Sequence, residues 1–134
     1  MDVVIELPGR PDQVRVARAR LRDLLRRTPR VDDAVLIASE LVTIALSHTG
    51  GRAEEGLRIT VSGLADPEAG WCRIAVRDSG RASRQGRVPG RGRLPRAPGV
   101  VVVSALADCF GARSGPDGSV VWADVRWGVR GEGS

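Results

Sequence analysis

Two acidic side chains stand in settings where a carboxylate could do chemistry. Glu40 falls within the apolar run from Ala34 to Val42, where helical spacing surrounds it mainly with hydrophobic neighbours. An ionised carboxylate in such a setting needs a partner, and it is able to orient or deprotonate a hydroxyl group. Asp78 follows an apolar, strand-like stretch and precedes Gly80 by two residues. Glu40 is therefore a candidate catalytic residue, with a structural ion pair as the alternative interpretation.

The helix that carries Glu40 is expected to begin at Asp32 or Asp33 and to run to about His48, where two glycines follow. Its apolar residues occupy nearly every side, which is typical of a helix that lies against a sheet. The sequence therefore predicts that Glu40 is presented from a buried helix.

An earlier helix is predicted from about Gln13, with Asp12 as its N-cap. Its apolar residues recur at helical spacing and form one buried stripe. The members of this stripe are Val14, Ala17, Leu21, Leu24 and Leu25. The arginines of the opposite face are expected to form a solvated ridge, made of Arg15, Arg18, Arg22 and Arg26.

Strand patterns and turn residues complete the outline. Strands are predicted at about 3–7, 57–63, 71–77 and 120–127. The turn-rich segments 65–70 and 114–118 are expected to belong to two hairpins, and an apolar helix is predicted from Gly99 to Cys109. This order favours an α/β two-layer sandwich, in which helices cover one face of a mixed, mainly antiparallel sheet.

The length of 134 residues fits one domain, expected over residues 1–127 with a flexible tail at 128–134. No basic segment followed by an apolar stretch opens the chain, and no run reaches the roughly 20 apolar residues of a membrane-spanning helix. We therefore expect a cytoplasmic protein without a membrane partner. Cys72 and Cys109 lack metal-ligand spacing, and each is expected to fill a core.

The positive charge is concentrated in one loop. The net charge is +5, yet residues 79–98 hold six arginines and no acid, which leaves −1 for the rest. This Gly- and Pro-rich segment is expected to be either a lid or a solvated binding surface. Aromatic residues make up only 3% of the chain, which disfavours stacking on nucleic-acid bases. Nucleic acid is therefore not an expected partner.

Three segments in the right order resemble the Bergerat-type ATP-binding domain that histidine kinases, Hsp90-type chaperones, gyrase-type topoisomerases and anti-sigma-factor serine kinases share. The last group is the most similar. Residues 39–48, S-E-L-V-T-I-A-L-S-H, are similar to its helix motif S-E-L-V-T-N-A-x-x-H. Residues 76–80, V-R-D-S-G, look like its adenine-binding motif, and residues 99–111 resemble its glycine-led helix after the ATP lid. Residues 118–123 are similar to its closing strand.

The resemblance implies a role for each matching residue. Glu40 would orient or deprotonate the attacking hydroxyl, and Asp78 would accept the amino hydrogens of adenine. Amides at the start of the helix from Gly99 would hold phosphate oxygens. The positions that the resemblance assigns to nucleotide binding are Asp78, Gly80, Gly99, Val100, Ser47 and His48. The expected cofactor is ATP.

The chain departs from the family pattern where the metal would bind. The family has Asn four residues after the Glu, as a ligand of Mg²⁺, whereas this chain has Ile44, and a hydrocarbon supplies no oxygen ligand. Further departures are Ala82, Ala97-Pro98 and Gly118-Ser119. Two hypotheses remain open. In one, the protein is an ATP-binding regulator, with serine/threonine kinase activity in question, that binds a sigma factor or an anti-anti-sigma factor and forms a homodimer. In the other, it is a degenerate interaction domain that no longer binds nucleotide.

Overall fold

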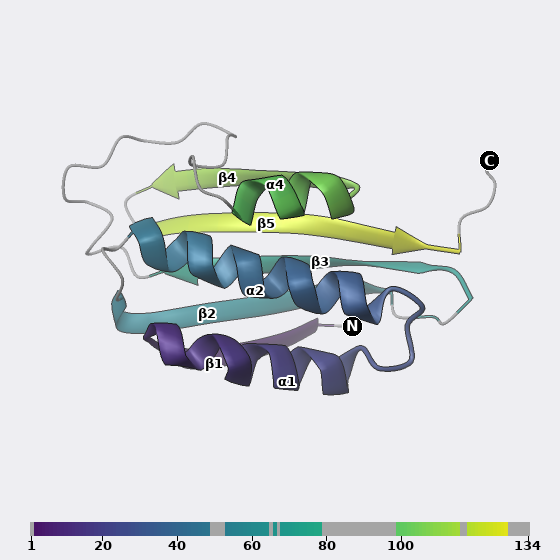
Figure 1. The fold of residues 1–134 in the computed structure, drawn as a ribbon, viewed down its shortest axis with the longest axis horizontal. Coiled ribbons are helices and arrows are strands. Elements are labelled where there is room, and N and C mark those ends of the chain that lie inside the picture. The colour runs from purple at the N-terminus through teal and green to yellow at the C-terminus, as the bar shows by residue number, and fades with distance from the viewer. Residues whose placement is uncertain are drawn as a thin grey trace.

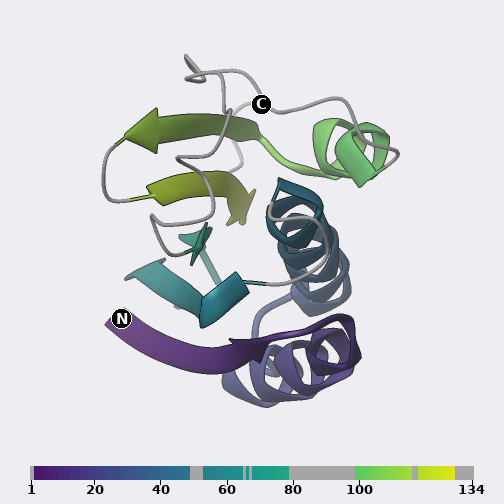
Figure 2. The same ribbon diagram turned by 90° about the vertical axis from the view of Figure 1, so that its left-hand side faces the viewer.

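The computed structural model describes residues 2–48, 53–64, 66, 68–78, 99–115 and 118–128. These residues form two layers, a five-stranded sheet and a set of helices that all lie on one of its faces (Figures 1 and 2). The predicted α/β two-layer sandwich is confirmed. The elements in chain order are β1 (Asp2–Gly9), the 3-10 helix η1 (Pro11–Gln13), α1 (Val14–Leu24), α2 (Val31–His48), β2 (Ala53–Leu64), β3 (Gly70–Asp78), α4 (Gly99–Leu106), β4 (Cys109–Gly115) and β5 (Gly118–Trp127).

The strands are arranged in the order β1-β2-β3-β5-β4, and each neighbouring pair in the described part is antiparallel. Side chains of β1 and β3 alternate between buried and exposed, as period-2 geometry requires when one sheet face is covered. In β3, Cys72, Ile74 and Val76 face the helices. β5 lies between β3 and β4 and is antiparallel to β3, so the start of β5 lies beside the end of β3.

The long helix α2 crosses the middle of the helical layer, between α1 and α4 (Figure 2). Its residues Ile37, Leu41 and Ile44 are fully buried, and they belong to one core with Ile59 and Ile74 of the sheet. This burial is expected for an almost uniformly apolar helix, because such a helix has no polar face to expose to solvent.

Helix α1 buries its predicted stripe and exposes its arginine ridge, but its start differs from the prediction. Ala17 and Leu21 are buried, and all four ridge arginines are exposed. Asp12 does not cap the helix. It lies within η1, where its carboxylate accepts hydrogen bonds from Arg10 and Gln13. The N-cap prediction was wrong because Pro11 starts a 3-10 turn before α1, so Asp12 is already inside the helical segment.

The helix predicted from Gly99 to Cys109 ends three residues early, at Leu106. Cys109 instead begins β4, where it pairs with Asp124. Its side chain is exposed, which contradicts the expectation that it fills a core, whereas Cys72 is buried as predicted. An apolar run is compatible with either a helix or a strand. The residues after Asp108 form a strand because the edge of β5 supplies backbone hydrogen-bond partners for them.

On the sheet face away from the described helices, Arg73 of β3 joins Trp122 and Asp124 of β5. Arg73 donates hydrogen bonds of 2.7 and 2.9 Å to Asp124, and its guanidinium lies 4.2 Å from the centre of the Trp122 ring. These hydrogen bonds raise the pKa of Arg73. Trp127 is buried and donates to the Asp66 carbonyl oxygen at 2.6 Å. Both indole rings therefore contact neighbouring parts of the chain.

No helix within the described ranges is long and apolar enough to span a bilayer. The Arg-rich loop predicted at 79–98, which contains Gly80, lies outside the described residues, and so does the predicted tail after Gly128.

Candidate functional site

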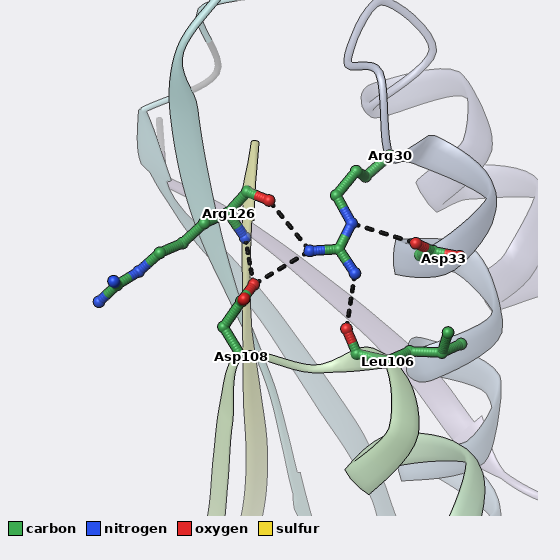
Figure 3. A network of polar contacts seen from close by, with 5 residues as sticks. All are labelled: Arg30, Asp33, Leu106, Asp108 and Arg126. Carbon is green, nitrogen blue, oxygen red and sulfur yellow. Dashed lines mark hydrogen bonds and ion pairs between the residues drawn. The ribbon is translucent and has the colours of Figure 1, made fainter. Parts of the chain in front are cut away.

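Arg30, just before α2, fixes the helical layer to one end of the sheet (Figure 3). Its guanidinium donates to the carboxylates of Asp33 and Asp108 at 3.1 and 3.0 Å. It also donates to the carbonyl oxygens of Leu106 at 2.6 Å and Arg126 at 3.0 Å. These contacts connect the start of α2, the end of α4 and the end of β5. One side chain therefore connects α2, α4 and the sheet, in addition to the hydrophobic core that they share.

The contacts of Arg30 lie at one end of the sandwich, and several candidate residues lie toward the other end. Because the start of α2 is tied to the end of β5, α2 runs antiparallel to β5 and its other end points toward the start of β5 (Figure 1). The end of β3 lies at the same place, since Arg77 pairs with Val120. The candidate residues on β3 and near the end of α2 therefore gather at the end of the molecule opposite Arg30.

Asp78 is the last residue of β3, and its side chain is only 2% exposed. Its Oδ1 accepts a hydrogen bond from the backbone N–H of Ser119 at 3.0 Å. Ser119 is also buried, and its hydroxyl lies 3.1 Å from that of Ser114. The hydrogen bond to the amide orients the carboxylate under the helical layer. A buried carboxylate at a strand end suits the exocyclic amino group of adenine, which donates hydrogen bonds.

Glu40 and Gly99 lie in direct contact across the interface between α2 and α4. A Cβ atom at position 99 would overlap Oε1 of Glu40, and it would lie 3.3 Å from the Cβ and 3.4 Å from the Cδ of that side chain. Gly99 is buried and is the first residue of α4. The carboxylate of Glu40 therefore lies beside the first turn of α4, where unpaired N–H groups and the helix dipole favour a negative charge.

The other predicted nucleotide-binding positions are Val100, Ser47, His48 and Gly80. Val100 is partly buried in the first turn of α4. Ser47 is exposed near the end of α2, and its hydroxyl donates to the Ile44 carbonyl oxygen at 2.8 Å. His48 ends α2, and its side chain, like the whole of Gly80, lies outside what the structure describes.

The residues present do not fit Mg²⁺ at the position where the family pattern places it. Ile44 has an exposed fraction of 0% and belongs to the hydrophobic core. Within the described parts of the chain, no group of three or more His, Cys, Asp or Glu side chains is placed to hold a metal ion. Among the candidate positions, Asp78 therefore offers a buried hydrogen-bond acceptor, whereas position 44 offers only a hydrocarbon.

The sequence analysis assigned no role to two residues, Ser119 beside Asp78 and Arg30 at the opposite end of the molecule. In the sequence, Ser119 stands out only as a departure from the family pattern. The local signal beside it is Gly118, whose φ of 118° marks the turn. Arg30 had no predicted role. The available signal was Asp33, three residues later in the first turn of a helix, but the three contacts with Leu106, Asp108 and Arg126 are long-range.

Comparison with known proteins agrees with this architecture. No curated protein matches the chain. A family model, described as the histidine kinase-like ATPase domain, matches residues 7–125, a span that runs from the end of β1 to near the end of β5 and includes Glu40, Asp78 and Gly99. The chain therefore belongs to the histidine kinase-like ATPase domain family.

Proposed function

We propose that this chain is a regulatory protein that binds ATP or a related adenine nucleotide and acts through a protein partner, in the manner of anti-sigma-factor serine kinases. The observation that carries the proposal is the buried carboxylate of Asp78, oriented by the Ser119 amide at the end of β3. Membership of the ATPase family supports it. In this proposal Asp78 recognises the adenine, while Gly99 and Val100 line the path of the phosphates.

Kinase activity is the weakest part of the resemblance, because Ile44 replaces the metal ligand and is buried in the core. We propose that the nucleotide acts mainly as a signal that alters binding of a sigma factor or an anti-anti-sigma factor. Glu40 remains the residue that would deprotonate an acceptor hydroxyl if phosphoryl transfer occurs.

Calorimetric titration with ATP and ADP, each with and without Mg²⁺, tests nucleotide binding. Asp78→Asn keeps the shape and the acceptor for the Ser119 amide but loses the carboxylate, so at least about tenfold weaker binding is expected. Asp23→Asn changes the charge equally on the exposed face of α1 and should bind like the wild type. Circular dichroism would verify that both variants are folded. Equal affinities of the two variants would argue against the adenine role of Asp78.

The alternative is a degenerate interaction domain that binds no nucleotide, which the buried Ile44 favours. It predicts no heat of binding with either nucleotide under any condition. The partner is tested separately. Purified sigma factors and anti-anti-sigma factors of the same genome would be measured for binding to the immobilised protein, with and without nucleotide, and light scattering would report whether the protein is a homodimer.

A further inference from the structure

We propose that the face of the sheet turned away from the helices binds a protein partner through an acidic, amphipathic helix of that partner. This inference rests on the partner-binding half of the proposed function and does not depend on nucleotide. The described helices all lie on the opposite face, so they leave the outer side chains of β3, β5 and β4 uncovered (Figure 2). We call these side chains the outer face.

The first feature of the outer face is a pair of arginines in one row across the strands. Arg77 of β3 and Arg113 of β4 both pair with Val120 of β5, which lies between them. Both arginine side chains are exposed, and neither forms an ion pair or side-chain hydrogen bond with any residue that the structure describes. Neighbouring strands lie about 4.8 Å apart, so the two arginine backbones are on the order of 10 Å apart. Two guanidinium groups at this spacing suit two carboxylates of a partner.

The second feature is a preformed flat strip beside this row. Trp122 of β5 pairs with Ala75 of β3 and with Gly111 of β4. Its ring occupies the space that a side chain at position 111 would fill, because a Cβ atom there would come within 2.8 Å of the ring. The guanidinium of Arg73 lies 4.2 Å from the ring centre and is itself held by Asp124. A surface that is already ordered loses little entropy when a partner packs on it.

The residue types of the outer face are those that anchor protein interfaces. Trp71, which is 42% exposed, pairs with the exposed Arg126 on β5. The outer face therefore carries two of the three tryptophans of the chain, each beside an arginine. Tryptophan and arginine are enriched among the few residues that supply most of the binding energy of an interface.

The third feature is the mixture of charges, which favours a protein over a nucleic acid. Glu6 and Asp124 lie among the arginines of the outer face, in ion pairs with Arg58 and Arg73. These carboxylates would repel a continuous phosphate backbone. The ring of Trp122 already has Arg73 over it, which leaves it badly placed to stack on a base. A partner with a few carboxylates and apolar side chains fits this face better.

The spacing of the two arginines indicates how a helix would lie. Residues i and i+7 of an α-helix are about 10 Å apart along its axis, and residues i+3 and i+4 between them share the same side. A helix across the strands would therefore bring two acids to Arg77 and Arg113 and an apolar side chain to Val120. Residues 79–98, which follow β3, hold six arginines and no acid, so their charge attracts the same partner.

The test is fluorescence anisotropy of the full chain with a labelled helical peptide that has Glu at i and i+7 and Leu at i+3 and i+4. The same peptide with Gln in place of Glu is the uncharged probe, and an oligothymidylate is the nucleic-acid probe. We expect the Glu peptide to bind and the Gln peptide to bind at least about tenfold more weakly. Arg77→Gln/Arg113→Gln should weaken binding of the Glu peptide by a similar factor.

Two control variants remove the same charge elsewhere. They are Arg15→Gln/Arg18→Gln on the exposed side of α1 and Arg84→Gln/Arg87→Gln within 79–98. Both should bind the Glu peptide within about twofold of the wild type, because charges beyond a Debye length are screened. Circular dichroism would verify that all three double variants are folded. A loss in either control as large as that of Arg77→Gln/Arg113→Gln would overturn the inference, since net charge or the 79–98 segment would then explain binding.

The remaining outcomes also decide the matter. Tighter binding of the oligothymidylate than of the Glu peptide, lost in Arg77→Gln/Arg113→Gln, would make this face a nucleic-acid site and the inference wrong. The acids nearest in sequence to the arginine row are Glu54, Glu55 and Asp117, whose side chains lie outside the described residues. If the Glu peptide binds only after these three are changed to amides, the chain itself occupies the arginines and the inference fails. If the Glu peptide does not bind at all but a sigma factor or an anti-anti-sigma factor does, the surface is wrong while the proposed function stands.

Discussion

The carboxylate of Glu40 on α2 lies so close to Gly99 on α4 that a Cβ atom at position 99 would overlap its Oε1 unless the carboxylate moved. The two residues are 59 positions apart in the chain. Their contact unites the buried helix with the glycine-led helix and places a negative charge at the start of α4. The contact depends on the packing of α2 against α4, and substitutions of Glu40 and Gly99 test it.

Gly99→Ala should destabilise the protein. In an unobstructed helix, alanine is preferred to glycine by about 1 kcal/mol. Here the added methyl group would displace the Glu40 carboxylate, and the expected net loss of unfolding free energy is about 1–3 kcal/mol. Urea denaturation followed by circular dichroism measures it.

The double variant Gly99→Ala/Glu40→Ala serves as the control for this contact. Because it removes the side chain that the methyl group meets, its cost should be smaller than the sum of the two single costs by about 1 kcal/mol or more. A Gly99→Ala protein that is more stable than the wild type would show that the contact does not persist in solution.

Arg30→Ala should cost about 2–4 kcal/mol of unfolding free energy, because it removes four hydrogen bonds, two to carboxylates and two to carbonyl oxygens. Asp108 keeps the hydrogen bond from the Arg126 amide at 2.8 Å. Arg22→Ala is the matched control. Arg22 makes a single exposed ion pair with Asp32, at 2.7 Å, and its loss should cost less than about 1 kcal/mol. Equal denaturation midpoints for the two variants would contradict the stabilising role of the Arg30 contacts.

Ile44→Asn should destabilise the fold rather than simply restore a metal ligand. An amide at a fully buried position loses its hydration without a partner, at an expected cost of about 2–4 kcal/mol. Ile44→Val, which only removes a methylene, should cost about 0.5–1.5 kcal/mol. Chemical denaturation compares them. An Asn variant as stable as the Val variant would mean that side chain 44 reaches solvent.

Cys72 and Cys109 should differ in reactivity toward a disulfide reagent at pH 8. Burial, with a smaller contribution from Asp124, raises the pKa of Cys72 from 9.0 to about 11. Cys109 is exposed. The Cys109 thiol should therefore react at once and the Cys72 thiol only on unfolding. Cys109→Ser should abolish the fast phase. A fast phase that survives in Cys109→Ser would contradict the burial of Cys72.

The same shift predicts a loss of stability in alkali. The unfolded chain loses the Cys72 proton near pH 9 and the folded chain near pH 11, so the folded state binds more protons between these values and unfolding becomes easier as the pH rises. The expected loss is on the order of 2 kcal/mol. The chain has no Lys and no Tyr, which leaves few other groups to titrate there. Denaturation midpoints at pH 8.5 and 11 measure it, and Cys72→Ala should show a smaller decrease.

Much of the fold was predictable because it follows from local periodicity. The apolar stripe of α1, the all-round apolar surface of α2 and the alternation in β3 each record how much of an element meets water. The expected N-cap at Asp12 failed because Pro11 opened a 3-10 turn, and the expected helix to Cys109 failed because an apolar run is compatible with helix or strand. At Cys109 the neighbouring strand β5 decided between helix and strand, whereas at Asp12 the cause is the adjacent proline.

The sequence by itself determined the two-layer architecture, the family and the candidate residues Glu40 and Asp78, since motif order and burial patterns are written along the chain. Only the tertiary structure decided that Glu40 lies against Gly99, that the Ser119 amide orients Asp78, and that Arg30 joins three elements. These contacts join residues 41 to 96 positions apart. No local pattern encodes them, because they form only once the core has packed and brought distant backbone groups together.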